Sequence, residues 1–258
     1  MSESLSPRAR KVMDLASSAS GYSILVEKGP GLDVWSATKY PRKEDRVCQI
    51  AYHPARAKYL DYLIAHECGH IYRFFSAPPE KALVPAGDPA RLQRAVEQLE
   101  TERWERKDHI PKREMKRFLE ALCSGLVRQL VNTPADCRIE EWIHGTFMEL
   151  RDIQASALRE LYSTCLNCLD RRVEQWTPPS IYQKSNALNY VMTKHVGGLL
   201  GKPDLIGPYV KAGYKDLGEI LDSRLGKEDK GYIGDVQAAD AWGRDLNVKE
   251  WYQWRRLE

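Results

Sequence analysis

The sequence predicts an α+β fold that is predominantly helical: a small three-stranded antiparallel sheet near the N-terminus, followed by a body of several helices. Three observations carry this prediction. Runs rich in β-branched and aromatic residues, separated by turn residues, are concentrated between positions 22 and 52. From Pro54 onward, apolar residues recur at the three- to four-residue spacing of amphipathic helices. The 258 residues, 43% of them hydrophobic, are enough for one large domain.

The sheet is expected to follow a short amphipathic helix over residues 7–18. The first strand covers 22–27 and ends at Gly29-Pro30-Gly31, which is a strong turn signal. The second covers 32–37. The third covers 46–52, where alternate residues fall on opposite faces of the strand.

The helical body is divided by prolines and polar loops. Pro78-Pro79 ends the first long helix, and Asn132-Thr133-Pro134 reads as an N-cap followed by proline at the first helical position. A new helix that carries Asp136 and Glu140 is therefore expected after Asn132. The helices are expected at about 57–75, 89–106, 111–131, from 134 to about 145, 151–174, 180–197, 205–224 and 234–246.

The helix over 57–75 contains the run His66-Glu67-Cys68-Gly69-His70. Positions i and i+4 lie about 40° apart on one helix face, so both imidazoles can reach the same point, about 2.0–2.1 Å from a Zn²⁺. Glu67 lies too far around the helix to be a good ligand. It can instead take a proton from a water that the zinc activates, which is the division of roles in HExxH metallopeptidases.

The alternative is that this triplet arose by chance on an ordinary helix. Three features favour a metal site. The polar residues interrupt an apolar helix, where they would be buried without purpose. Gly69 costs roughly 1 kcal/mol of helix stability relative to alanine and makes sense where a strand or a substrate passes close. A β-rich section directly precedes the helix.

The run from Tyr62 to Ile71 resembles the active-site helix of zincin metallopeptidases, and most closely that of the ImmA/IrrE-type intracellular peptidases, whose HExGH helix also follows a small antiparallel sheet. The resemblance covers about residues 22–75, with a looser extension to residue 145. It implies a cytoplasmic, zinc-dependent endopeptidase that acts on one protein target in a regulatory role. It also implies that 46–52 is an edge strand along which the peptide substrate is laid as an added strand.

A third zinc ligand is expected from Asp136 or Glu140, which are spaced i, i+4 on one helix. Gluzincins, which this pair resembles, place a ligand glutamate on a second helix and an acid four residues later that is bonded to a ligand histidine. Here the order of residue types is swapped. Either Asp136 binds the metal and Glu140 orients a histidine, or Glu140 is the ligand and Asp136 the orienting group. A solvent-exposed helix start rich in acids is the competing interpretation.

The spacing departs from the ImmA/IrrE pattern. There the third ligand follows the second histidine by a few tens of residues, whereas here Asp136 follows His70 by 66 positions and Glu140 by 70. An inserted helix, such as the one expected at 89–106, would account for the difference.

Other candidate groups carry weaker signals. Cys165 and Cys168 form a CxxC, which without a second pair or a βαβ context indicates two buried helical thiols. Cys68 is expected to be a core thiol or to lie near the metal. The side chains that could stabilise a transition-state oxyanion are His53, Tyr162, Tyr182, Tyr190 and His195, and no choice among them follows from the sequence.

Composition excludes several classes of function. The net charge is +3 with a pI near 8.4, and the basic runs at 111–117 and 254–256 are broken by acids or hydrophobic residues, so nucleic-acid binding is not expected. No stretch approaches the roughly 18 apolar residues that span a bilayer. The polar N-terminus has no signal-peptide pattern, and the six scattered cysteines are expected to be reduced thiols, so a cytoplasmic location is expected.

These expectations combine into a single zincin-like domain over 1–258. Within it, 22–75 holds the sheet and active-site helix, 76–150 supplies the third ligand, and 151–258 is a helical C-terminal part. Pro178-Pro179 is the best candidate for a domain boundary, but the segments after it are expected to be further helices and not a separate module. Two rival hypotheses remain at this point: a catalytically silent zinc-containing module that binds a protein partner, and a regulator associated with nucleic acid. The oligomeric state does not follow from the sequence.

Overall fold

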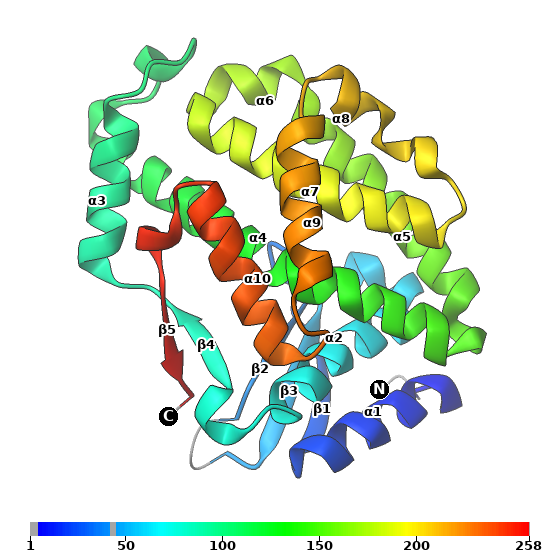
Figure 1. Cartoon of the computed structure of the whole chain (residues 1–258). Coiled ribbons are helices and arrows are strands. Elements are labelled where there is room, and N and C mark those ends of the chain that lie inside the picture. The colour runs from blue at the N-terminus through cyan, green and yellow to red at the C-terminus, as the bar shows by residue number, and fades with distance from the viewer. Residues whose placement is uncertain (1–4, 42–44, 258) are drawn as a thin grey trace.

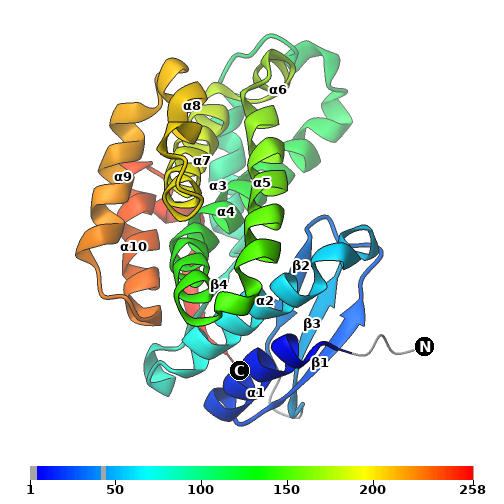
Figure 2. The same ribbon diagram turned by 90° about the vertical axis from the view of Figure 1, so that its right-hand side faces the viewer.

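The fold is a small sheet with helices on one side and a larger helical body beyond them (Figures 1 and 2). The computed structural model describes residues 5–41 and 45–257. It confirms the predominantly helical α+β class. The helices are α1 (Pro7–Ser20), α2 (Leu60–Phe75), α3 (Pro89–Glu100), α4 (Lys112–Thr146), α5 (Arg151–Leu166), α6 (Arg171–Trp176), α7 (Pro179–Leu199), α8 (Gly207–Lys211), α9 (Lys215–Lys227) and α10 (Tyr232–Asp245). The strands are β1 (Ser23–Lys28), β2 (Ser36–Lys39), β3 (Val47–Tyr52), β4 (Leu83–Ala86) and β5 (Gln253–Arg256).

The N-terminal sheet is mixed and has the order β1-β3-β2. β2 pairs with β3 in the antiparallel sense, but β1 pairs with β3 in parallel, with Ile24 opposite Cys48. Two predictions were therefore wrong: the sheet is only partly antiparallel, and 46–52 is not an edge strand, because β3 has a neighbour on each side. Within the described residues, β1 and β2 form the edges of this sheet.

The segment 29–35 explains this topology. The Gly29 amide donates to the carbonyl of Tyr52 at 2.8 Å, and the His53 amide donates to that of Trp35 at 2.8 Å. The chain leaving β1 therefore passes the end of β3 and returns on its far side. Alternation within a strand predicts which face is buried, not which strand lies beside it, so the sequence could not give this order.

A second, two-stranded sheet is formed by β4 and β5, with Ala86 paired to Gln253. The prediction that the chain is helical throughout after Pro54 was wrong here. Each strand has four residues, which is too short for alternation to be recognised, and the partners come from distant parts of the chain. Figure 1 places this ribbon beside α3 and α10, apart from the N-terminal sheet.

Helix α4 is continuous from Lys112 to Thr146, so the predicted helix break at Asn132-Thr133-Pro134 was wrong. Pro134 removes a single backbone donor from the helix. Beside it, the Thr133 hydroxyl donates to the carbonyl of Gln129 at 2.7 Å. Packing on both sides maintains the helix here, because Leu130, Val131, Thr133, Pro134 and Ala135 are all buried.

Other helix boundaries differ less. The helix expected at 89–106 ends at Glu100, the one expected at 151–174 divides into α5 and α6, and the one expected at 205–224 divides into α8 and α9. No helix in the described part of the chain combines the length and hydropathy needed to cross a bilayer.

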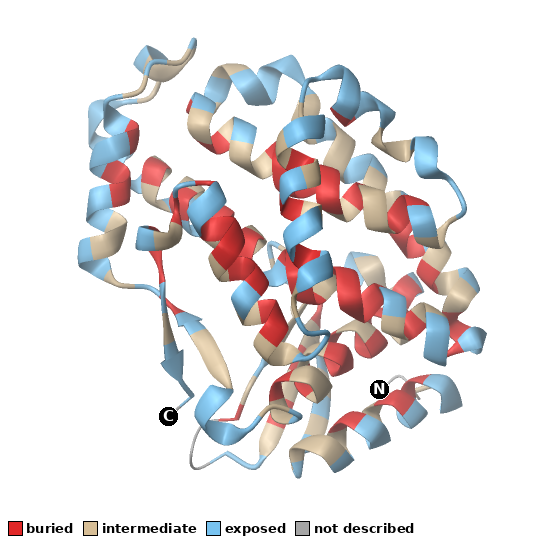
Figure 3. Ribbon diagram, in the orientation of Figure 1, coloured by how far each residue is buried: buried red, intermediate tan, exposed pale blue. Residues whose placement is uncertain are grey.

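Two groups of buried apolar residues form the core, visible as red segments in Figure 3. One joins α1, α2, β3 and the second half of α4, with Val12, Ile50 and Ile64 fully buried. The other joins the first half of α4 to α3, α7, α9 and α10, around Trp242 and Tyr190. Helix α4 thus connects the sheet region to the helical body.

Helices α2 and α4 cross closely at Gly69. A Cβ added at Gly69 would lie 2.7 Å from Cγ2 of Ile139, which is fully buried on α4. The glycine is required because a second helix packs against it, not because a strand or a substrate passes there, as the sequence had suggested.

Replacing Gly69 with alanine is expected to lower the free energy of unfolding by about 1–3 kcal/mol, because Ile139 must move from a packed core. This loss outweighs the gain of roughly 1 kcal/mol that alanine brings to a helix. Urea unfolding of Gly69→Ala, Ile139→Ala and the double variant measures the effect, and the double variant should lose less than the sum of the two. Gly125→Ala on α4, where an added Cβ meets no atom within 4 Å, is the control and should be neutral or stabilising. Additive losses would contradict the close contact.

Candidate metal site

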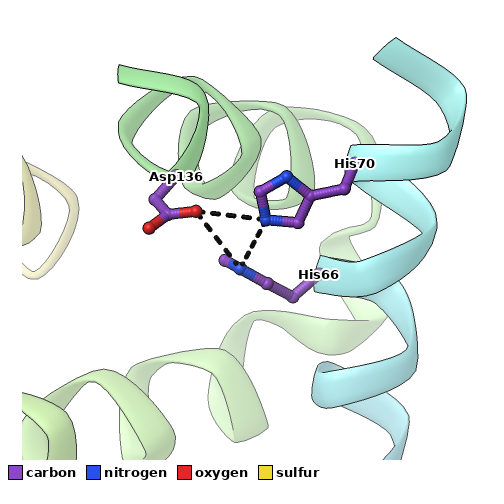
Figure 4. Close-up of side chains that lie close together, drawn as sticks. All are labelled: His66, His70 and Asp136. Atoms are coloured by element: carbon purple, nitrogen blue, oxygen red, sulfur yellow. Dashed lines mark hydrogen bonds and ion pairs between the residues drawn. The ribbon is translucent and has the colours of Figure 1, made fainter. Parts of the chain in front are cut away.

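Three potential metal-ligand atoms meet between α2 and α4 (Figure 4). His66 and His70 come from successive turns of α2, and Asp136 comes from α4. The two Nε2 atoms are 3.2 Å apart. Oδ1 of Asp136 lies 3.1 Å from Nε2 of His70 and 3.5 Å from Nε2 of His66. Within the described residues these three side chains form the one group of His, Cys, Asp and Glu residues suited to hold a metal ion.

The spacing of these atoms fits a tetrahedral metal. Ligand atoms about 2.0–2.1 Å from a tetrahedral centre are separated by about 3.3 Å, whereas adjacent ligands at right angles around the centre would be separated by about 2.9 Å. The three separations of 3.1, 3.2 and 3.5 Å lie around the tetrahedral value. Two imidazole nitrogens and one carboxylate oxygen are also a donor set typical of catalytic metal sites.

The group is partly open to solvent. The side chains of His66 and His70 are each 18% exposed, and that of Asp136 is 25% exposed. A metal held by these three atoms would therefore keep a free position that water or a substrate could reach. A fully buried structural site would lack such access.

Glu140 lies behind His66 rather than in the group. Its Oε1 is 2.8 Å from Nδ1 of His66 and accepts a hydrogen bond from the Tyr62 hydroxyl at 2.7 Å. Its Oε2 accepts from Nε2 of Gln154 at 2.7 Å. The Glu140 carboxylate can only accept when ionised, so Nδ1 of His66 carries a hydrogen and Nε2 is the nitrogen that faces Asp136 and His70. Of the two alternatives left by the sequence, this geometry favours Asp136 as the ligand and Glu140 as the orienting group.

The charges of the group are strongly coupled. Burial disfavours the charged form of His66, but its hydrogen bonds with Asp136 and Glu140 outweigh burial and raise the pKa of His66 well above its usual range. Burial alone would raise the pKa of Asp136, but hydrogen bonds from His66 and His70 lower it well below its usual range. The Asp136 carboxylate is thus held ionised, as a metal ligand must be, whereas His66 must release a proton when a metal binds.

Glu67 is hydrogen-bonded to the sheet. Its Oε1 accepts a hydrogen bond from the Ser36 hydroxyl at 2.7 Å, and its Oε2 accepts from the Thr38 hydroxyl at 2.7 Å. The residue is 5% exposed. The expected base therefore lies on the same helix as the histidines but is bound to the edge strand β2.

The other predicted side chains lie elsewhere. His53 accepts from the amide of Ala55 at the start of a 3₁₀ turn. Tyr162 donates to the carbonyl of Leu205, Tyr190 donates to Glu219, and Tyr182 packs edge-on against Tyr214. His195 lies between Glu141 and Asp222. None of these belongs to the metal group.

The six cysteines are not joined in disulfides. Cys68 is fully buried and burial raises its pKa, so it is a core thiol and not a ligand of the group. Cys165 lies in the last turn of α5 and Cys168 in the 3₁₀ turn that follows, and both are only partly buried rather than buried as expected. Burial raises the pKa of Cys165 to about 12.

Four residues that contact the site were missed from the sequence: Ser36, Thr38, Tyr62 and Gln154. Tyr62 had a usable signal, because it lies four residues before His66 on the same helix face. Gln154 and the two hydroxyls of β2 had none, because their proximity depends on how separate elements pack.

Comparison with known proteins adds no relative: no family model, curated protein or solved structure matches this chain significantly.

Substitution of the two acids should separate their roles. Glu140→Gln should lower the affinity for Zn²⁺ by roughly 10- to 100-fold, the usual cost of losing a partner that orients a ligand, and Asp136→Asn should lower it further. Competition with a chromophoric chelator measures the two dissociation constants. Glu141→Gln, at the neighbouring half-exposed acid, is the control and should bind as the wild type does. A larger loss in Glu140→Gln than in Asp136→Asn would reverse the assignment.

His195 should make stability depend on pH at alkaline values. Burial lowers its pKa, but hydrogen bonds with Asp222 and Glu141 outweigh burial and raise it to about 9. The unfolded histidine titrates near 6.5. The stabilisation is thus complete below about pH 6.5 and is lost as pH rises through about 9. Its upper limit is about 3 kcal/mol.

Urea unfolding of the wild type and His195→Gln at pH 6 and pH 9.5 tests this. The difference in unfolding free energy should be larger at pH 6. The same substitution at exposed His109 is the control for general effects of alkaline pH. An equal difference at both pH values would contradict the assignment.

Proposed function

We propose that this chain is a zinc-dependent endopeptidase that hydrolyses a peptide bond in a protein target. The observation that carries the proposal is the convergence of two histidines and Asp136 at tetrahedral spacing with an open side. Glu67, next to His66 on α2, supplies the acid–base group that hydrolysis requires. The motif resemblance to ImmA/IrrE-type peptidases supports the same activity.

Zinc is the metal that fits this donor set best. Two histidines and one carboxylate also bind non-haem Fe(II), usually with near-octahedral geometry. The three ligand separations of 3.1, 3.2 and 3.5 Å are compatible with tetrahedral zinc at its usual bond lengths. The HExxH spacing on a helix is typical of zinc peptidases.

The zinc would supply Lewis acidity, activating a water and polarising the carbonyl of the scissile bond. The chain's own residues supply orientation and proton transfer. Glu140 holds the His66 ring in the tautomer that presents Nε2. Ser36 and Thr38 each donate to a different oxygen of Glu67. A carboxylate offers about four acceptor positions, so Glu67 keeps capacity to accept a proton from water and to pass it to the leaving amine.

The substrate would lie along β2. This strand is an edge of the sheet, and two of its side chains hold Glu67. An extended peptide can add to such an edge through main-chain hydrogen bonds. β2 takes the place that the sequence had assigned to 46–52.

A metal-containing binding module without catalysis is the second candidate. The observation that favours it is the engagement of Glu67: both of its oxygens are bonded to β2 and the residue is almost fully buried. In that case Glu67 would join α2 to the sheet as a structural link.

The substitution Glu67→Gln distinguishes the two. In a peptidase, the zinc-loaded variant should keep stoichiometric zinc and lose roughly 100-fold or more of its cleavage rate, which is the usual contribution of a general base. Mass spectrometry of new termini in a proteome-derived peptide library measures cleavage. Exposed Glu97→Gln is the matched control. Cleavage that survives zinc removal would contradict the proposal, and stoichiometric zinc without cleavage by the wild type would favour the binding module.

A further inference from the structure

A pocket of about 470 Å³ lies between β4, the start of α3, the middle of α4 and the segment that leads into β5. Its volume is in the range of roughly 300–1,000 Å³ that small ligands occupy. Most of its lining is apolar and includes Leu92, Val127, Val131, Trp251 and Tyr252. None of the three residues of the metal group lines this pocket.

The pocket adjoins the metal group along α4. Asn132 lines the pocket and precedes Asp136 by four residues in the same continuous helix. The two positions are therefore about 6 Å apart along the helix axis and about 40° apart around it. A substrate side chain beside the metal would therefore lie about one helical turn from the wall of the pocket at Asn132.

A salt bridge connects the pocket to the segment that precedes the edge strand β2. Arg128, one turn before Asn132, lines the pocket and pairs with Asp33, its Nη2 lying 3.0 Å from Oδ2. Asp33 belongs to the segment that leads directly into β2. A peptide lying along β2 and across the metal group would thus pass the mouth of the pocket.

We infer that this pocket receives a large apolar side chain of the substrate peptide, next to the bond that is cleaved. The inference rests on the proposed peptidase function and adds its specificity. Trp251 and Tyr252 provide aromatic walls and are themselves buried. A charged side chain would lose its hydration against these walls, and the charged residues of the lining, Asp88 and Arg128, already have partners in the first turn of α3 and in Asp33. At the mouth, Arg128 and Asn132 offer donors for the carbonyl groups of the peptide backbone.

Dipeptide hydroxamates test the inference without requiring cleavage. The hydroxamate is a metal-binding group, and the side chain beside it can be Ala, Asp, Leu or Phe. Isothermal titration of the zinc-loaded wild type should give Leu and Phe compounds that bind about 10- to 100-fold more tightly than the Ala and Asp compounds, as expected for burying the extra apolar area.

Two variants of exposed positions on α4 locate the effect. Ser124 lines the pocket, and Ala121 does not. Ser124→Trp fills the pocket and should reduce the preference for Leu and Phe to less than threefold, with little change for the Ala compound. Ala121→Trp should keep the wild-type preference.

The outcomes separate this inference from the proposed function. Equal binding of all four hydroxamates, or an unchanged preference in Ser124→Trp, overturns the pocket assignment and leaves the metal site standing. Binding of N-acetyl-phenylalanine amide as tight as that of the Phe hydroxamate also overturns it, because the pocket would then act as a separate small-molecule site. Failure of the zinc-loaded protein to bind any hydroxamate overturns the open metal site and the inference with it.

Discussion

The contact between Gly69 on α2 and Ile139 on α4 is the constraint on which the candidate site depends. Because Gly69 has no side chain, the two helices approach closely at this point. His66 and His70 flank Gly69 on one helix, and Asp136 precedes Ile139 by one turn on the other. Arg73 of α2 and Arg138 of α4 both bind the buried carboxylate of Asp235 on α10, with the shortest distances 2.6 and 2.8 Å. These ion pairs also connect α2 to α4 through α10.

Two polar networks leave helix α2 in different directions. Glu140, Tyr62 and Gln154 surround the Nδ1 side of His66 and connect it to α5. Ser36 and Thr38 connect Glu67 to β2. Adjacent residues of one helix are thereby tied to different neighbours, His66 to α4 and α5 and Glu67 to β2.

Local patterns predicted what depends on one helix or one strand. The spacing of His66 and His70, and of Asp136 and Glu140, predicted which side chains share a face. Alternation in 46–52 predicted two opposite faces, of which the structure buries the one with Cys48, Ile50 and Tyr52. What depends on packing between elements was not predictable. The central position of β3, the continuity of α4 through Pro134, and the pairing of β4 with β5 are of this kind. The contact of Glu67 with β2 belongs with them.

X-ray absorption at the zinc edge of the zinc-loaded protein tests whether two imidazoles and one carboxylate hold a zinc ion with an open position. We expect stoichiometric zinc with only nitrogen and oxygen neighbours at about 2.0–2.2 Å and the scattering pattern of two imidazole rings. A sulfur neighbour at about 2.3 Å, which would implicate a thiol such as that of Cys68, or the pattern of a single imidazole would contradict it.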